Sequence, residues 1–574
     1  MRISGAQAII RCLVEAGVDT VFGYPGGAVI PLYDALYEGP LKHILTVHEQ
    51  GAIHGADGYA RATGKVGVCI ATSGPGATNI VTGLATAYLD SVPLVAITGQ
   101  VATTQLGRDS FQEIDIVSVS MAVTKHNYLV LKPEDLVPVL RDAFMIAQEG
   151  RPGPVLVDIP SNIQTALVEW RELEGREEIC GQRQQKQVNE GDLPNIAEAI
   201  EVLKKAKQPV LLAGGGIIRS KASQEFRALA KDGNFPVVST LMGLGAFNGS
   251  DEQFLGLTGM HGNKMANRAI YEADVIVAIG ARFSDRATGD RQEYAKEKTI
   301  IHIDVDPSEI AKNISTQLAL IGNMKAILTE LRENYSKTVN KDWWNRLYQW
   351  QDGEKASNTA TESNRVSEGQ VNLLTGPEIM HCLNQFAQGK DIVYVTDVGQ
   401  NQMWAAQHLV IREPRAFITS GGAGTMGFGL PAALGAQIGR TDSMVVHLCG
   451  DGGFKMTGME LFTAQNQQLP LLSIVIDNQS LGMVRQWQKI FYNQRYSATT
   501  LPSFSFHEFA KACSVLAVQA STVADFKAAL SKAAQYIQQE RKPFLIVATI
   551  SPDDLVLPMI APGSTLDKYV EFFR

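Results

Sequence analysis

Two segments with acid and amide side chains follow apolar runs in the last third of the chain. Residues 444–449 lead into Gly450-Asp451-Gly452-Gly453, and residues 472–476 lead into Asp477-Asn478-Gln479-Ser480. In a doubly wound sheet, ligands bind beyond the carboxyl ends of the strands, so both segments are expected to open onto one crevice. Oxygen ligands suit Mg²⁺ held partly through a phosphate group, and glycines let the backbone approach a ligand closely. The pair predicts a metal and diphosphate site, with a plain β-turn as the alternative interpretation of GDGG.

A glycine pattern just upstream offers a competing interpretation. Residues 422–427 (GAGTMG) match GxGxxG between a strand-like run, 416–419, and a helical run, 431–439. A dinucleotide-binding fingerprint also needs an acid about 20 residues further on. Asp442 comes too early for this role and Asp451 somewhat late. The hypothesis of a nicotinamide-dependent oxidoreductase therefore rests on this match alone, and a turn with close backbone packing explains the glycines equally well.

Three short segments of the first 80 residues are candidates for binding the other end of a ligand. Tyr24-Pro25-Gly26-Gly27 follows a strand-like run, and residues 73–79 (SGPGATN) form a glycine turn into a helix. The exposed N–H groups of such a turn could hold an anion or a cofactor ring. Glu49 follows an apolar run, where a carboxyl group could exchange a proton with a heterocyclic nitrogen. The alternative for Glu49 is an acid that stabilises a helix N-terminus or forms an ion pair.

These segments must be positioned by α/β domains, because strand-like apolar runs alternate with helical patterns along the chain. The expected strands are 20–22, 66–71, 94–98, 155–159, 209–213, 275–279, 299–303, 392–396, 444–449, 472–476 and 543–548. We predict three doubly wound parallel-sheet domains joined by two polar linkers. The predicted order is domain 1–168, linker 169–192, domain 193–336, linker 337–371 and domain 372–574.

Composition excludes several classes of function. The 574 residues are 45% apolar and carry a net charge of −8, and without a basic patch a nucleic-acid partner is not expected. No apolar run approaches the roughly 20 residues that span a bilayer, and residues 1–16 lack the features of a signal peptide, so we expect a cytoplasmic protein. The six cysteines are scattered without a CxxC pair, which favours buried core residues over disulfides or zinc ligands. Trp343, Trp344 and Trp350 indicate that part of the second linker packs.

Taken in order, the motifs resemble the thiamine-diphosphate-dependent enzymes, and within them the catalytic large subunits of acetohydroxyacid synthase, also called acetolactate synthase. The resemblance covers nearly the whole chain. Its pieces are FGYPGGA (22–28), HEQGA (48–52), ATSGPGATN (71–79), FQE (111–113), TKHNYLV (124–130), GRPGPVLVDIP (150–160), GMHG (259–262), GARFSDR (280–286), HIDVDP (302–307), TDVGQ (396–400), GTMGFGLPAA (424–433), GDGG (450–453), DNQSLGMVRQWQ (477–488) and LPMIAPG (557–563).

The family implies a transferase with thiamine diphosphate, Mg²⁺ and FAD as cofactors. Pyruvate would be decarboxylated, and the hydroxyethyl carbanion/enamine would attack a second 2-ketoacid, pyruvate or 2-ketobutyrate. The products would be 2-acetolactate or 2-aceto-2-hydroxybutyrate, in the biosynthesis of the branched-chain amino acids valine and isoleucine. The implied assembly is a homodimer or a dimer of dimers with active sites between chains, with a small regulatory subunit as a further partner and no membrane partner. The alternative on the same scaffold is a pyruvate oxidase or decarboxylase.

Roles for individual residues also follow from the resemblance. Glu49 would hydrogen-bond N1′ of the aminopyrimidine, Met426 would hold the cofactor in its bent form, and Asp451, Asn478 and the carbonyl group of Ser480 would bind Mg²⁺. The other residues implied to bind thiamine diphosphate are Tyr24, Pro25, Gly26, Thr72, Pro75, Asn79, Gln112, Val398, Gly399, Gln400, Gly424, Gly452, Gly453, Leu481, Gly482 and Met483.

The family also implies a flavin site and a substrate pocket. Arg286 would help to select the second 2-ketoacid, and Trp487 would favour 2-ketobutyrate as acceptor. The pocket would be completed by Gly27, Phe111, Gln112, Lys125, Met483 and Val484. The residues implied to bind FAD are Arg151, Gly214, Gly215, Thr240, Leu241, Met242, Gly259, Met260, His261, Gly280, Arg282, Asp285, Arg286, Asp304, Val305, Glu309 and Asn323.

Five positions depart from the family pattern. Ser161-Asn162 stands where the family usually has Lys-Asp, which removes a positive charge near the substrate entrance. Ser284 replaces an acid of the usual RFDDR, and Asn323 stands where Asp is common, so both alter expected flavin contacts. Asn401 stands where His often follows the glutamine. None of these changes affects Glu49, Asp451 or Asn478, so the core chemistry is expected to persist.

Overall fold

The computed structural model describes residues 1–171, 193–350 and 373–570. These residues form two compact units. The first unit contains the amino-terminal and carboxyl-terminal sheets, and the second contains the central sheet. The parts of the predicted linkers at 172–192 and 351–371 lie outside the described residues. Each unit is described separately below.

The amino-terminal sheet has six strands, all paired in parallel. Across the sheet, the order is β3 (Lys42–Leu45), β2 (Thr20–Gly23), β4 (Gly67–Ala71), β5 (Leu94–Gln100), β7 (Pro154–Pro160) and β6 (His126–Leu129). A separate antiparallel pair joins β1 (Arg2–Ser4) to β8 (Leu167–Glu169). The helices are α1 (Gly5–Glu15), α2 (Ile30–Glu38), α3 (Glu49–Thr63), α4 (Pro75–Asn79), α5 (Val81–Leu89), α6 (Ile116–Ser120), α7 (Leu136–Gln148) and α8 (Ser161–Thr165).

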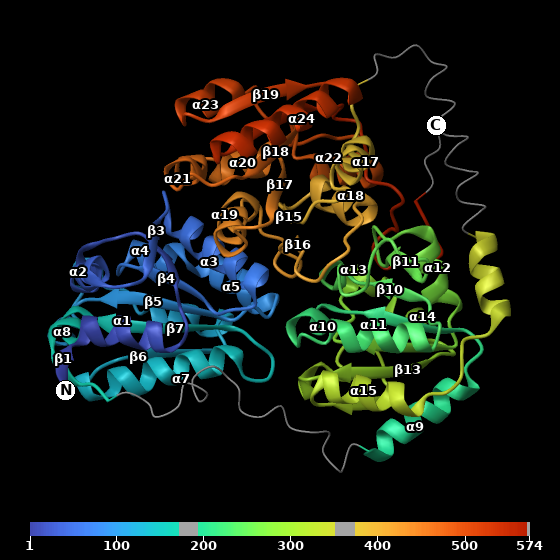
Figure 1. The fold of residues 1–574 in the computed structure, drawn as a ribbon, viewed down its shortest axis with the longest axis horizontal. Helices are drawn as coiled ribbons and strands as arrows, with labels where there is room; N and C mark the ends of the chain where they lie inside the picture. Colours follow the sequence, from blue (N-terminus) through green and yellow to red (C-terminus); the bar gives the residue numbers. More distant parts are fainter. Residues whose placement is uncertain (172–192, 351–372, 571–574) are drawn as a thin grey trace. The chain divides into compact units, whose positions relative to one another are not determined.

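Both faces of this sheet are covered by helices, as Figure 1 shows. Successive side chains of a strand point to opposite faces. In β4, Val68 and Ile70 belong to the core that contains α1, α2 and α7, whereas Cys69 and Ala71 belong to the core that contains α3 and α5. Burial on both faces explains why the central strands read as continuous apolar runs in the sequence.

The carboxyl-terminal sheet lies in the same unit and also has six strands. Its order is β16 (Phe417–Ile418), β15 (Ile392–Thr396), β17 (Met444–Gly450), β18 (Leu472–Asp477), β20 (Phe544–Thr549) and β19 (Leu516–Ala520), and the pairings from β15 to β19 are parallel. The helices around it are α19 (Gly429–Gly439), α20 (Asp451–Thr457), α21 (Glu460–Asn466), α22 (Gly482–Phe491), α23 (Phe506–Ala512) and α24 (Val523–Glu540). A further helix, α18 (Gln400–His408), follows β15.

The central sheet, in the second unit, repeats this plan with parallel pairings throughout. Its order is β11 (Phe254–Leu257), β10 (Val237–Ser239), β9 (Pro209–Ala213), β12 (Val275–Ile279), β13 (Thr299–Asp304) and β14 (Leu318–Ile321). The helices of this unit include α9 (Leu193–Lys205), α10 (Gly215–Arg219), α11 (Ser223–Asp232), α12 (Lys264–Glu272), α13 (Asp285–Thr288), α14 (Arg291–Ala295), α15 (Met324–Asn334) and α17 (Gly376–Phe386). The prediction of three parallel-sheet α/β domains is confirmed.

Smaller predictions can also be compared with the described residues. Trp343 and Trp344 are buried in the central core, where the Trp343 indole donates to the Pro209 carbonyl at 3.3 Å, so part of the second linker does pack. Five cysteines (Cys12, Cys69, Cys382, Cys449 and Cys513) are buried and form no disulfide, as predicted, and Cys180 lies outside the described residues. Within the described ranges, no helix combines the length and apolar character needed to cross a membrane.

Within the first unit, the amino-terminal and carboxyl-terminal domains meet where α3 packs on α19. Glycines bring the two backbones into close approach. A Cβ atom on Gly435 would lie 1.8 Å from the Gly55 carbonyl oxygen, and one on Gly58 would lie 2.1 Å from the Ala432 carbonyl oxygen. This contact therefore excludes side chains at these positions.

Gly435→Ala tests this contact. Alanine favours a helix over glycine by about 1 kcal/mol, but overpacking against a backbone atom typically costs about 1–3 kcal/mol, so we expect a lower midpoint of thermal unfolding. Gly27→Ala is the matched control, because its Cβ atom would have no neighbour within 4 Å. An unchanged midpoint for Gly435→Ala would contradict the packing described.

Candidate functional site

Asp451 lies at the carboxyl end of β17, where the sequence predicts a metal ligand. Its carboxylate is fully buried and neither oxygen makes a hydrogen bond. Burial, together with the charge of the nearby Asp477, raises the pKa of Asp451 to about 6, although the ammonium group of Lys455, 3.6 Å away, opposes the shift. A buried carboxylate without hydrogen bonds is costly unless a cation offsets its charge, so this position fits a bound divalent metal ion.

Asn478 and Ser480 follow the neighbouring strand β18 and complete the predicted ligand set. The Asn478 amide group donates to Gln400 Oε1 at 3.1 Å, and the Asn478 oxygen accepts from the Ser480 backbone at 3.1 Å. A Cβ atom on Gly482 would lie 2.0 Å from Gln400 Oε1. The structure therefore brings together the predicted residues that follow β15, β17 and β18.

The cradle expected for a diphosphate group is built from the same three strand ends. Gly399 has a φ of 126°, a conformation that favours glycine. A Cβ atom on Gly452 would lie 2.9 Å from Leu481 and 3.5 Å from Met426, and one on Gly424 would lie 3.9 Å from Val398. The predicted residues Val398, Gly399, Gly424, Met426, Gly452, Gly453 and Leu481 thus lie around one edge of the sheet.

Asp397, which the sequence analysis did not select, holds the Met426 loop in place. This buried carboxylate accepts hydrogen bonds from the backbone N–H groups of Val398, Gly427 and Gly429, at 2.8–3.1 Å. Burial raises the pKa of Asp397, and these backbone donors oppose the shift. The available signal was an acid directly after the apolar run 392–396.

Glu49 is the first residue of α3, so the helix-terminus interpretation describes its local position. Its carboxylate also accepts a hydrogen bond from the Asn79 amide group at 3.0 Å. A Cβ atom on Gly76 would lie 3.3 Å from Glu49 Oε1 and 2.7 Å from Thr72. Gly76 and Asn79, which follow β4, therefore lie beside Glu49, and Thr72 lies beside Gly76. Gly26 approaches Thr72, whose hydroxyl accepts from the Ala28 N–H at 3.3 Å, and Tyr24, Pro25 and Gly27 lie in the same segment after β2.

Gln112 joins this edge through a strained backbone. Its φ of 59° is unusual for a residue other than glycine, and a Cβ atom on Gly74 would lie 2.9 Å from the Gln112 backbone. The loop is tied to the sheet because the Gln100 amide donates both to the Ile114 carbonyl at 2.8 Å and to the Asp158 carboxylate at 3.0 Å. The Thr98 hydroxyl donates to Asp158 at 2.6 Å.

A network of charged side chains links the two domains of the first unit. Arg61 forms an ion pair with Asp57 and, at 3.0 Å, with Asp90, and it donates to the Thr419 carbonyl at 2.8 Å. The Asp90 carboxylate accepts from the backbone of Gly421 and Gly422 at 3.0 and 2.8 Å. The amino-terminal domain thereby fixes the loop that leads to Met426.

Two predicted residues lie away from this edge. Lys125 precedes β6, and its amine donates to the carbonyl oxygens of Ile146 and Glu149 near the end of α7. Arg151 precedes β7 and donates to the Ser91 hydroxyl at 2.8 Å. Both therefore sit toward the amino ends of their parallel strands, whereas the Glu49 group sits at the carboxyl ends.

Met483, Val484 and Trp487 lie on α22, which follows the β18 segment. Val484 is 50% exposed, and Trp487 makes an edge-to-face contact with Phe491 at 5.4 Å. Phe111, the remaining apolar residue predicted for the pocket, is 87% exposed. These surfaces are available to a ligand or a partner chain.

In the second unit, the residues predicted to bind flavin gather at the carboxyl ends of the central strands. Gly214, Gly280 and Asp304 end or follow neighbouring strands, and a Cβ atom on Gly214 would lie 2.0 Å from the Gly280 carbonyl oxygen. The others in this group are Gly215, Thr240, Leu241, Met242, Gly259, Met260, His261, Arg282, Asp285, Arg286, Val305, Glu309 and Asn323.

His261 and Arg286 are neighbours within this group. His261 Nε2 is buried without a hydrogen bond, and burial together with the Arg286 charge lowers the His261 pKa to about 4. Arg286 contacts the Met260 sulfur at 3.1 Å, and its carbonyl accepts from the Met260 backbone at 2.8 Å. A neutral imidazole with a free nitrogen fits a polar group of a bound cofactor.

The positions that depart from the family pattern have local roles. Asn162 forms two hydrogen bonds with Thr103, each of 2.9 Å. Asn323 is the N-cap of α15, where its oxygen accepts from Ala326 at 3.2 Å, a role that Asn fills as well as Asp. Ser284 precedes α13 without a capping hydrogen bond, and Asn401 is buried with an unbonded oxygen.

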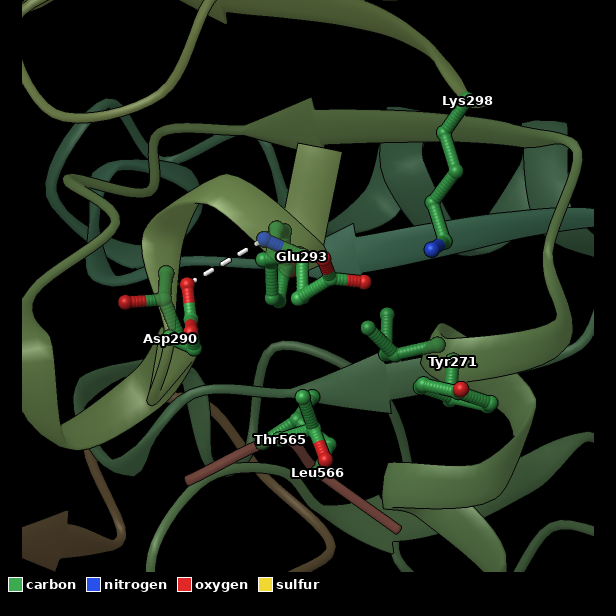
Figure 2. Close-up of a pocket in the computed structure, with 9 residues that line it drawn as sticks. Tyr271, Asp290, Glu293, Lys298, Thr565 and Leu566 are labelled. Atoms are coloured by element: carbon green, nitrogen blue, oxygen red, sulfur yellow. Dashed lines mark hydrogen bonds between the residues drawn. The ribbon is translucent and has the colours of Figure 1, made fainter. Parts of the chain in front are cut away.

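A small hollow in the second unit is distinct from the candidate site (Figure 2). It lies beside Tyr271, Glu293 and Lys298, and the Lys298 amine is 5.5 Å from the Tyr271 ring centroid. Asp290, at its rim, caps α14 through the Glu293 backbone at 3.2 Å. None of the residues predicted to bind a ligand lines this hollow, so it plays no part in the assignment below.

Asp158 generates a testable pH dependence. Burial raises its pKa to about 7 despite the hydrogen bonds from Thr98 and Gln100. The folded state then binds more protons than the unfolded state between pH 4 and 7, so this group makes the protein less stable as pH rises through that window, at up to about 1.4 kcal/mol per pH unit. Urea unfolding of Asp158→Asn should therefore show a smaller loss of stability across pH 4–7 than the parent chain, and parallel curves would contradict the assignment.

Comparison with known proteins follows the same division of the chain. Models of the thiamine pyrophosphate enzymes match residues 3–119 (N-terminal TPP binding domain), 196–331 (central domain) and 397–548 (C-terminal TPP binding domain). The matched ranges contain Glu49, the central strand ends and Asp451 respectively.

Curated relatives match over nearly the full length. The probable acetolactate synthase large subunit of Methanocaldococcus jannaschii is 42% identical over 587 residues, covering 100% of this chain and 96% of that protein. The acetolactate synthase isozyme 2 large subunit of Escherichia coli is 42% identical, covering 99% and 100%. The acetolactate synthase large subunit of Corynebacterium glutamicum is 43% identical, covering 98% and 89%. The chain belongs to the thiamine pyrophosphate enzymes, in the family of acetolactate synthase large subunits.

Proposed function

We propose that the chain decarboxylates pyruvate and joins the remaining two-carbon unit to a second 2-ketoacid, giving 2-acetolactate or 2-aceto-2-hydroxybutyrate for valine and isoleucine synthesis. The observation that carries the proposal is the presence of two complementary half-sites in the first unit. One is the Glu49–Asn79 pair at the amino-terminal sheet, and the other is the unbonded, buried Asp451 at the carboxyl-terminal sheet.

Thiamine diphosphate, when bound, supplies the electron sink for decarboxylation and the carbon that attacks the acceptor. Glu49 exchanges a proton with the ring nitrogen N1′, and the hydrogen bond from Asn79 fixes the direction of its carboxylate. Asp451, Asn478 and the Ser480 carbonyl group hold Mg²⁺, while Gly399, Gln400, Gly452 and Gly453 receive the diphosphate group. Met426 would support the cofactor in its bent form. It lies in the loop that Asp397 holds through the N–H groups of Gly427 and Gly429.

We assign acceptor selection to Arg286 and Trp487. A guanidinium group pairs well with the carboxylate of a 2-ketoacid, and the apolar wall of a tryptophan favours the longer side chain of 2-ketobutyrate. One extra methylene in an apolar pocket is worth about 1–3 kcal/mol, which allows a moderate preference. Gly27, Phe111, Gln112, Met483 and Val484 complete the proposed pocket.

We also propose that the second unit binds FAD without net electron transfer. Gly214 and Gly280 let the ends of neighbouring strands pack backbone to backbone beneath the proposed site, and the His261 nitrogen that has no hydrogen bond would donate to or accept from the cofactor. The acids Asp304 and Glu309 lie at the end of β13 and just beyond it, where a ribose would be expected. The flavin would stabilise this unit structurally.

The proposed catalytic assembly is at least a homodimer, in which the Glu49 half-site of one chain meets the Asp451 half-site of another. Several apolar side chains of the first unit are exposed in the single chain, as expected for surfaces that a second copy covers. They include Tyr88, Leu89, Val119, Met121, Met456, Met459 and Phe462. Because the relatives are named large subunits, we further propose a small regulatory partner. The free, buried cysteines agree with the reducing cytoplasm as its location.

An omission assay tests the activity. Enzyme stripped of cofactors should form no acetolactate from pyruvate when thiamine diphosphate or Mg²⁺ is left out, and leaving out FAD should lower activity or stability without oxygen consumption. Acetate formation with reduction of an acceptor would favour an oxidase, and acetaldehyde a decarboxylase. Activity that needs NAD(P) and survives magnesium chelation would overturn the proposal.

Asp451→Asn separates the metal site from the fold. Without Mg²⁺, this variant should unfold at a temperature close to that of the parent, because it removes a buried carboxylate that has no hydrogen bond and a 3.6 Å pairing with the partly exposed Lys455. It should lose the stabilisation that Mg²⁺ and thiamine diphosphate together give the parent chain, which amounts to about 2.7 kcal/mol at 100 times the Kd. Retention of the full stabilisation would exclude Asp451 as a ligand.

A further inference from the structure

Glu460 is a buried acid that the proposed chemistry does not use. It is the first residue of α21 in the carboxyl-terminal domain, and it is 2% exposed. Its carboxylate accepts a hydrogen bond from the Val47 backbone N–H, at 3.2 and 3.3 Å from its two oxygens. The Thr463 hydroxyl donates to Oε2 at 2.6 Å. The Glu460 carboxylate therefore links the two domains of the first unit, and the residue that it binds, Val47, is two residues before Glu49.

The segment that Glu460 binds, residues 46–48, leads directly into the first turn of α3. His48 is the N-cap of α3, with an extended backbone, and its Nδ1 atom accepts from the Gln50 N–H at 3.0 Å. The Thr46 hydroxyl donates to the His48 carbonyl at 3.0 Å, and the Ala52 N–H donates to the same carbonyl at 3.0 Å. These bonds fix the segment internally, and the bond to Glu460 anchors it to the other domain.

The sequence also leaves space for this carboxylate. A Cβ atom on Gly51 would lie 2.0 Å from Glu460 Oε1, so a side chain at position 51 would displace the carboxylate. Gly51 sits inside the first turn of α3, where glycine costs about 1 kcal/mol of helix stability relative to alanine. Its presence there allows the acid of one domain to reach the backbone of the other.

Holding a carboxylate in this place has an energetic cost. Burial raises the pKa of Glu460 to about 7, even though the Thr463 hydroxyl and the backbone amides of Val47 and His48 oppose the shift. A charged acceptor binds N–H and O–H donors roughly twice as strongly as a neutral one. The charge is thus an advantage where a backbone segment must be held in one position.

We propose that Glu460 is a positioning residue for Glu49: from the carboxyl-terminal domain it anchors the backbone at Val47 and so sets the direction in which the Glu49 carboxylate leaves α3. The inference rests on the proposed role of Glu49 in proton exchange with the cofactor ring. A misplacement of about 1 Å at a reacting group can lower a rate about 100-fold. Glu460 itself touches neither cofactor nor substrate.

The test compares Glu460→Gln with the parent holoenzyme, using hydrogen–deuterium exchange at C2 of bound thiamine diphosphate, followed by NMR after acid quench. Glu460→Gln keeps the shape but loses the charge, so we expect exchange and kcat to fall about 10- to 100-fold. The Kd for Mg²⁺ and thiamine diphosphate should change less than threefold, because the Asp451 half-site is untouched. Gly51→Ala, which retains the acid but displaces it, should lower exchange in the same direction.

Two further variants make the outcome decisive. Glu378→Gln is the matched control, since Glu378 also accepts a backbone N–H, from Thr375 at 2.9 Å, but at the start of α17 in the second unit. It should leave exchange unchanged. Glu49→Gln should abolish exchange; if it does not, the proposed function of Glu49 fails. If Glu49→Gln abolishes exchange while folded Glu460→Gln and Gly51→Ala both exchange at the parent rate, the positioning role of Glu460 is overturned and the proposed function stands.

Discussion

The contact between α3 and α19 is the constraint on which the first unit depends. Glycines at positions 58 and 435 let the two helix backbones touch, and this contact holds the two sheets at a fixed distance. Only at such close range can a side chain of one domain reach the backbone of the other. Asp90 and Glu460 both do so, and each binds N–H groups of a loop that ends near a proposed catalytic group.

The two cross-domain contacts are reciprocal. The amino-terminal domain, through Arg61 and Asp90, fixes the residues 419–422 that lead to Met426, and the carboxyl-terminal domain, through Glu460, fixes the residues that lead to Glu49. Each half-site is thus held by the domain to which it does not belong. Charged acceptors suit this purpose because their hydrogen bonds to backbone N–H groups are strong and directional.

Sequence reasoning recovered what depends on local pattern. Strands buried on both faces, such as β4, β5, β17 and β18, were predicted within one or two residues because they are continuous apolar runs. The edge strands β3, β6, β11, β14 and β19 were missed, since each has only four or five residues and includes exposed or half-buried side chains. The inner strand β10 was missed as well, because it is only three residues long. The sequence motifs, taken in their order along the chain, located the strand ends that form the candidate site. Asp90 and Glu460 escaped because their partners lie more than 300 residues away in the chain.

Asp397 and Asp451 show why a motif alone does not separate a scaffold acid from a ligand. Both follow apolar runs, on the neighbouring strands β15 and β17, and burial raises the pKa of each. Asp397 is bonded to three backbone N–H groups and so is already satisfied within the fold. Asp451 has no such bonds; the Lys455 ammonium lies 3.6 Å away, and both carboxylate oxygens are left open to a bound cation. The two acids therefore differ in whether the fold itself supplies hydrogen bonds to the carboxylate. For Asp397 most of these bonds form only once the loop 424–429 has folded over the sheet.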